Sequence, residues 1–254
     1  MYNLINYPIV FFLVSFVVLL LSAWAGTLLR RRHALEEGAR DDFGVIQAAT
    51  LTLLGLILGF SFSMAISRYD QRKNLEEEEA NAIGTEYLRA DLLPAADAAK
   101  AKELLERYTE QRIAFYVTRD LEEYRQIVAR TAKLQAELWS AVQVPAVAQP
   151  TPLSALAVAG MNDVLNSQGY TQAAWWNRIP VSAWGLMVTM AICCNVLTGY
   201  GARNARSERM LLVVLPLVVS ITFMLIADID SPRGGLIRVH PQNLTNLLES
   251  LHPK

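Results

Sequence analysis

The residues best suited to chemistry are carboxylates at the edges of apolar stretches. Four consecutive glutamates occupy 76–79, and Asp228 and Asp230 follow a long apolar run. An acidic ring at a membrane interface concentrates cations when a symmetric oligomer repeats it around an axis. We therefore single out Glu76, Glu79, Asp228 and Asp230 as a candidate ion-attracting mouth.

Both acidic segments also have simpler interpretations. Residues 228–235 read as a helix stop with an Asp–Arg pair, and a run of four glutamates spreads around a helix as ordinary solvated surface. If the mouth interpretation holds, Asp228→Asn alters conductance or selectivity more than it alters folding.

A stripe of small residues is the second pattern of interest. Its members recur at spacings of three or four and so share one helix face; they are Ala48, Thr52, Gly55, Gly59, Ser63 and Ser67. Such stripes let membrane helices approach closely, and Gly59→Leu would then disrupt assembly. Alternatively, the stripe lines a pore or surrounds its axis in an oligomer. Asn195, deep in another apolar run, joins this set as an interhelical hydrogen-bonding or functional residue.

Signatures of catalysis and metal binding are missing from the sequence. The three histidines and the adjacent Cys193 and Cys194 have no metal-ligand spacing. There is no phosphate-binding glycine loop and no Gly-x-Ser-x-Gly element. The formal net charge of −1 gives no argument for nucleic acid. We expect no enzyme, no cofactor, no metal and no nucleic-acid partner.

Four apolar stretches must position these residues. Each is close to the roughly 20 residues that cross a bilayer, and none carries a charge near its centre. They cover about 8–29, 43–67, 179–202 and 210–227. The sequence predicts an all-α membrane protein with four transmembrane helices in two hairpins. A helical extramembrane domain is inserted between the second and third spans.

The corresponding divisions are a first hairpin at 1–68, the extramembrane domain at 69–178, a second hairpin at 179–228 and a tail at 229–254. Within the domain, periodicity and breakers predict a continuation of the second span to Gly84 and helices over about 95–118 and 121–142. A proline-rich loop at 144–152 precedes a short helix over 154–167. The tail has an amphipathic pattern through Leu244 and Leu247.

The hairpin loops indicate an orientation. Each is short and rich in arginine, so the positive-inside rule places both in the cytoplasm and the 69–178 segment outside. The start of that segment is also basic, at Arg68, Arg72 and Lys73.

Four motifs in fixed order carry a family resemblance. They are GLILGFSFSMA with SRYD (55–65, 67–70), EANAIGT with YLR (79–85, 87–89), NRIP (177–180) and ADIDSPRGG (227–235). Together they resemble the bacterial DUF4239 membrane proteins, often called bestrophin-like, over nearly the whole chain. The resemblance implies a four-span membrane protein. It further implies kinship with bestrophins, which are pentameric anion channels with a hydrophobic neck in the second span. Bestrophins place the segment between spans two and three in the cytoplasm, opposite to the charge pattern here.

These patterns favour an oligomeric bestrophin-like ion channel of a bacterial inner membrane. The second span would line or surround its pore, with inorganic ions, lipid and further copies of the chain as partners. A pentamer follows by analogy alone. The acidic segments favour cations and the bestrophin analogy favours anions, so the charge of the conducted ion stays open. The alternative is a non-conducting scaffold or sensor whose extramembrane domain binds a partner.

Overall fold

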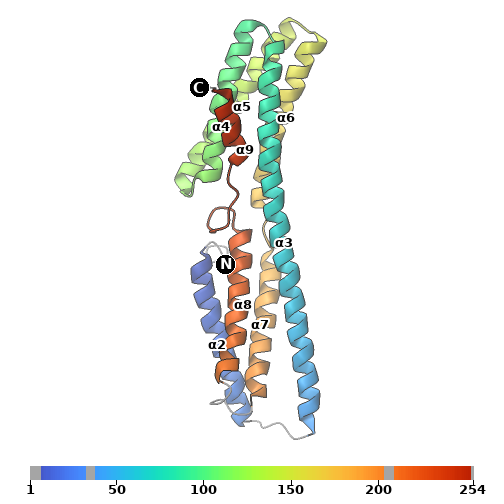
Figure 1. Cartoon of the computed structure of the whole chain (residues 1–254), viewed down its shortest axis with the longest axis vertical. Coiled ribbons are helices and arrows are strands. Elements are labelled where there is room, and N and C mark those ends of the chain that lie inside the picture. Colours follow the sequence, from blue (N-terminus) through green and yellow to red (C-terminus); the bar gives the residue numbers. More distant parts are fainter. Residues whose placement is uncertain (1–6, 33–37, 203–208, 253–254) are drawn as a thin grey trace. The chain divides into compact units, whose positions relative to one another are not determined.

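The computed structural model describes residues 7–32, 38–202 and 209–252, and in these ranges the chain is helical with no strand (Figure 1). This confirms the all-α prediction. The elements are α2 (Pro8–Arg32), α3 (Ala39–Arg89), the short 3₁₀ helix η1 (Ala90–Leu92), α4 (Ala95–Val117), α5 (Leu121–Ala148), α6 (Pro152–Trp176), α7 (Val181–Gly201), α8 (Arg209–Asp230) and α9 (Gln242–Leu251).

Four helical stretches of the described chain are long and apolar enough to cross a membrane, as predicted. They lie in Pro8–Arg32, Ala39–Leu92, Pro152–Gly201 and Leu212–Asp230. The apolar window of the second stretch is the least buried of the four. Helix α3 continues from this window without a break to Arg89, beyond the predicted end at Gly84. An isolated glycine costs a helix only about 1 kcal/mol, which tertiary packing readily offsets.

The chain divides into two compact units. The first, called the membrane unit here, comprises residues 1–68 and 178–238, and the second, the helical unit, comprises 69–177 and 239–254. Helix α9 thus belongs to the helical unit. The proposed boundaries of four separate segments stay a prediction.

Helices α2, α7 and α8 form the packed part of the membrane unit. Phe11 of α2 lies 5.3 Å from the ring of Trp184 on α7, and both rings contact Phe223 of α8. Trp184 is almost fully buried, which differs from the interfacial position that aromatic residues near a span's start usually take. Gly26 and Gly199 mark a close approach of α2 to α7, where a Cβ on either would overlap backbone of the other helix.

The helical unit packs the end of α3, α4, α5, α6 and α9 around a core that includes Leu105, Tyr108, Phe115, Leu138 and Met161. Two predictions need correction here. Helix α5 passes through Pro145 to Ala148, so the predicted loop at 144–152 shrinks to three residues. Helix α6 extends through the exposed Gly169 to Trp176, well beyond 154–167.

Local chemistry explains where α6 begins. Thr151 and Ser154 form a capping box, and Pro152 occupies the first turn, where its missing N–H costs no hydrogen bond. The amphipathic tail forms α9, with Leu244 fully buried against the core of the helical unit.

Candidate functional site: the exposed face of α3 and the buried carboxylates

The stripe of small residues on α3 is exposed within the membrane unit. Ala48, Thr52, Gly55, Gly59, Ser63 and Ser67 are all exposed. A Cβ built on Gly55 or Gly59 would meet no atom within 4 Å. The stripe therefore takes no part in helix packing within a single chain.

The opposite face of α3 supplies its contacts inside the unit. Leu54, Leu58 and Ala65 are buried there, with Leu54 only 2% exposed. The Thr52 hydroxyl donates to the Ala48 carbonyl at 2.9 Å, so its polarity is partly satisfied within α3. The stripe is thus part of a broad surface of α3 that the described chain leaves uncovered, and the exposed apolar residues Leu53, Leu56 and Phe60 belong to the same surface.

Contacts with α7 hold α3 near its first residues. Gln47 Nε2 donates to Thr198 Oγ1 at 3.4 Å, and Cys194 Sγ donates to the carbonyl of Thr50 at 3.5 Å. The rings of Phe43 and Tyr200 lie 5.5 Å apart. These contacts fix the start of the candidate span against α7.

Asp230 holds the other end of the span. Its carboxylate is fully buried and accepts the backbone N–H of Ile179 through both oxygens, at 3.1 and 3.2 Å. Arg68, at the end of the apolar part of α3, lies 3.4 Å away, and Arg178 lies 4.0 Å away. One carboxylate thereby links α3, α8 and the segment preceding α7. The arginines that pair with Asp230 here, Arg68 and Arg178, lie outside the 228–235 segment in which the sequence suggested an Asp–Arg pair.

Asp228 orders the segment that follows α8. It is buried, and its two oxygens accept the backbone N–H groups of Leu236 and Ile237 at 2.7 and 2.8 Å. Gly235 lies so close that a Cβ there would overlap the Asp228 carbonyl. This geometry gives the Asp228 side chain a structural role, so Asp228→Asn should also affect folding, and its effect on conductance or selectivity stays a prediction.

Asn195 is fully buried in α7, where its amide donates to the Ala191 carbonyl of the same helix at 2.8 Å. Its Oδ1 has no hydrogen-bond donor among the described residues. The default expectation of an interhelical bond is therefore not met within the described chain.

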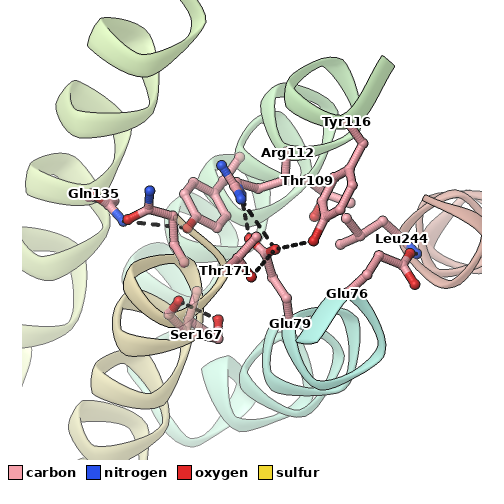
Figure 2. Close-up of polar contacts among 12 residues, drawn as sticks. Glu76, Glu79, Thr109, Arg112, Tyr116, Gln135, Ser167, Thr171 and Leu244 are labelled. Atoms are coloured by element: carbon pink, nitrogen blue, oxygen red, sulfur yellow. Dashed lines mark hydrogen bonds and ion pairs between the residues drawn. The ribbon is translucent and has the colours of Figure 1, made fainter. Parts of the chain in front are cut away.

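Glu79 is the centre of a buried polar cluster in the helical unit (Figure 2). Its carboxylate pairs with Arg112 of α4 through Nε and through Nη2 at 3.3 Å. Tyr116 Oη and Thr171 Oγ1 each donate to Glu79 Oε2 at 3.3 Å. Burial and the charge of Glu79 raise the pKa of the Tyr116 phenol, so it stays protonated and can only donate to this acceptor.

Glu76 caps the first turn of α9. It is almost fully buried and accepts from the Leu244 backbone N–H at 3.0 Å (Figure 2). It also accepts from Asn243 Nδ2 at 2.6 Å. A carboxylate is favoured at a helix N-terminus, because it satisfies free N–H groups and opposes the helix dipole. Glu77 and Glu78 are exposed, so the glutamate run is solvated surface at only half its positions.

The structure gives all four predicted mouth carboxylates protein partners, and it groups them by unit: Asp228 and Asp230 in one, Glu76 and Glu79 in the other. An ion-attracting role for them stays a prediction. No group of three or more metal-ligating side chains occurs within 7–32, 38–202 and 209–252. Sequence reasoning missed Arg112, Thr171 and the glycines Gly26 and Gly199, whose partners are distant in the sequence.

Comparison with known proteins decides the family. A bestrophin-like domain profile matches residues 12–244. The chain belongs to the bestrophin-like family. This bestrophin-like chain is a multi-pass membrane protein, as its candidate spans indicate.

Solved structures share the fold of this bestrophin-like chain. A bacterial bestrophin homologue from Klebsiella pneumoniae is 13% identical, with a TM-score of 0.65 over 96% of this chain and 99% of that one. A point variant of the same homologue gives 0.64 at 13% identity, over 97% and 99%. A structure described only as a membrane protein gives 0.64 at 12% identity, over 94% and 96%. A comparison with functionally curated proteins finds no match.

Proposed function

We propose that this chain is the subunit of an oligomeric bestrophin-like ion channel in which the exposed stripe of α3 lines or surrounds the ion pathway. The observation that carries the proposal is the exposure of Gly55, Gly59 and Ser63, since the opposite face of the same helix is buried. One helix face cannot enclose a pore, so several copies must contribute. Membership of the bestrophin-like family supports channel activity.

The ion is expected to be an anion. The four candidate carboxylates are buried and have protein partners, so they give little support to cation selectivity. The bestrophin analogy then supplies the remaining argument. The reversal potential in asymmetric potassium chloride measures the sign directly.

The proposed setting is the bacterial inner membrane, crossed by α2, α3, α7 and α8 as two hairpins. Four crossings place the segment between the hairpins on the same side as both chain ends. The arginine-rich loops favour the outer side, whereas the bestrophin analogy favours the cytoplasm. A reporter fused at about position 110 decides between them.

Currents across planar bilayers test the proposal. Ser63→Phe adds bulk to the stripe and should reduce the single-channel current of the purified protein. Val14→Phe is the matched control, because Val14 is 43% exposed on α2 and lies outside the stripe. An equal effect of the two substitutions would contradict the proposed role of the stripe.

A non-conducting scaffold or sensor is the second candidate. The observation that favours it is a set of exposed apolar side chains near the α5–α6 connection, where Val144, Val147 and Leu153 are 65%, 74% and 53% exposed. A partner protein bound there would cover them. An electrically silent bilayer containing an intact oligomer would favour this candidate over the channel.

A further inference from the structure

Glu86 is a buried carboxyl group that the proposed channel does not use. It lies near the end of α3 in the helical unit and is 1% exposed. Neither of its oxygens has a hydrogen-bond partner among the described residues. An ionised carboxylate in such a place is strongly unfavourable, so the group must bind a proton or a cation.

The opposing helix is shaped to hold this side chain. Gly160 of α6 lies against it, and a Cβ on Gly160 would overlap the Glu86 carboxyl group and lie 2.6 Å from Nη1 of Arg89. Any larger residue at 160 would displace Glu86 or Arg89. The absence of a side chain at Gly160 therefore creates the space in which Glu86 is buried.

Glu79 shows which partners a buried glutamate can have on this helix. It lies two helical turns before Glu86 on the same side of α3 and is also buried. Glu79 has Arg112, Tyr116 and Thr171 as partners, whereas Glu86 has none of this kind. The two carboxyl groups are equally buried and differ in their hydrogen-bond and ion-pair partners.

The charged groups that act on Glu86 are Arg89 of α3 and Asp163 of α6. Burial raises the pKa of the Glu86 carboxyl from 4.5 to about 8; Arg89 opposes this shift and Asp163 adds to it. Arg89 thus fails to compensate for the loss of solvation. The carboxyl group is neutral at pH 7 and loses its proton as the medium becomes mildly alkaline.

We propose that Glu86 is a proton-binding site that holds α3 against α6 when protonated and weakens this contact when it ionises. A bound proton neutralises the Glu86 carboxyl group, whereas Arg112, Tyr116 and Thr171 stabilise the carboxylate of Glu79. Because no cluster of three metal-ligating side chains occurs in the described ranges, a proton fits the site better than a metal ion.

The sign of the pH dependence follows from proton linkage. The folded pKa lies above the unfolded value, so the folded state binds the proton more tightly. The contribution to stability is fully present below about pH 4.5 and is lost as the pH rises through about 8. A glutamine at this position mimics the neutral acid and cannot ionise.

Thermal unfolding of the full chain between about pH 6 and pH 9.5 tests the proposal. The melting temperature of the wild type should fall across this range, while Glu86→Gln should remove this part of the fall and be the more stable protein at the alkaline end. Glu78→Gln is the matched control, since Glu78 is exposed on the same helix. It should follow the wild type.

Infrared spectroscopy supplies a second readout that does not depend on how well a variant folds. The wild type near pH 6 should show a protonated carboxylic acid band that disappears near pH 9.5 and is missing from Glu86→Gln. Absence of this band in the wild type would overturn the proposal. So would an identical alkaline loss in Glu86→Gln, or a calcium-induced rise in melting temperature that requires Glu86.

Discussion

Two pairs of glycines in the membrane unit make opposite use of a missing side chain. Gly26 and Gly199 lie where α2 crosses α7, and a Cβ on either would overlap the carbonyl of Val196 or Ala23. Gly55 and Gly59 lie on α3, where a Cβ would meet nothing within 4 Å. The first pair is required by contacts inside the chain, and the second is free of any such requirement.

This difference shows why spacing alone does not identify a packing face. Gly55 and Gly59 form a regular stripe in one helix, yet the close contact is made by two glycines that no local pattern joins. A helix held mainly by its other face can keep small residues exposed for a neighbouring subunit or an ion pathway.

The largest expected effect comes from Gly199→Leu. The new side chain would meet backbone atoms of α2, which cannot move aside as a flexible side chain can. We expect a loss of about 3 kcal/mol or more, since overpacking costs are highest where the surroundings are rigid. Size-exclusion chromatography and thermal unfolding in detergent measure it. A variant as stable as the wild type would show that α2 and α7 do not cross closely.

Asp230→Asn should have the next largest effect. The glycines Gly55 and Gly59 of α3 make no close contact, so contacts near the ends of the span must hold this helix in the unit. The ion pair between Arg68 and Asp230 is one of them. Removing the charge leaves Arg68 and Arg178 with a neutral partner near a buried site. We expect about 2 kcal/mol of destabilisation. Arg125→Gln is a control from an exposed ion pair and should cost under about 1 kcal/mol. An equal loss of unfolding free energy in the two variants would show that Asp230 does not hold α3 in place.

Gly59→Leu should have the smallest effect on the stability of the chain. It adds a side chain where the unit has open space, so we expect a change within about 0.5 kcal/mol. Its effect on assembly separates the two interpretations of the stripe. Dissociation of the oligomer would indicate packing against a neighbouring subunit, whereas an intact oligomer with reduced current would indicate a pore-facing position. Strong destabilisation of the isolated chain would contradict the claim that Gly59, unlike Gly199, faces open space.

The sequence predicted most of the fold because its signals are local. Uncharged stretches of about 20 residues mark the spans, and the lack of a breaker after Ser67 indicated that α3 continues. The predicted helix breaks at Pro145 and Gly169 were wrong, because whether a helix tolerates these residues depends on its packing against neighbouring helices and on its caps.

The candidate site was harder to predict, since its contacts are nonlocal. Nothing near Glu79 in the sequence indicates Arg112, and nothing near Glu86 indicates Gly160. Asp228 and Asp230 were chosen because they follow the fourth span, and Glu76 and Glu79 because they belong to a run of four glutamates. Three of them accept hydrogen bonds from the backbone N–H groups of Ile179, Leu236 and Leu244, and such backbone partners cannot be assigned from residue types.

The most direct measurement is thiol-reagent block of reconstituted current. Cys193→Ala and Cys194→Ala first remove the native cysteines, and Gly59→Cys is then compared with Val14→Cys in that background. A charged, membrane-impermeant reagent should reduce the current of Gly59→Cys and leave Val14→Cys unchanged. Full labelling of Gly59→Cys with no change in current, or equal block of both variants, would contradict a pore lined or surrounded by α3.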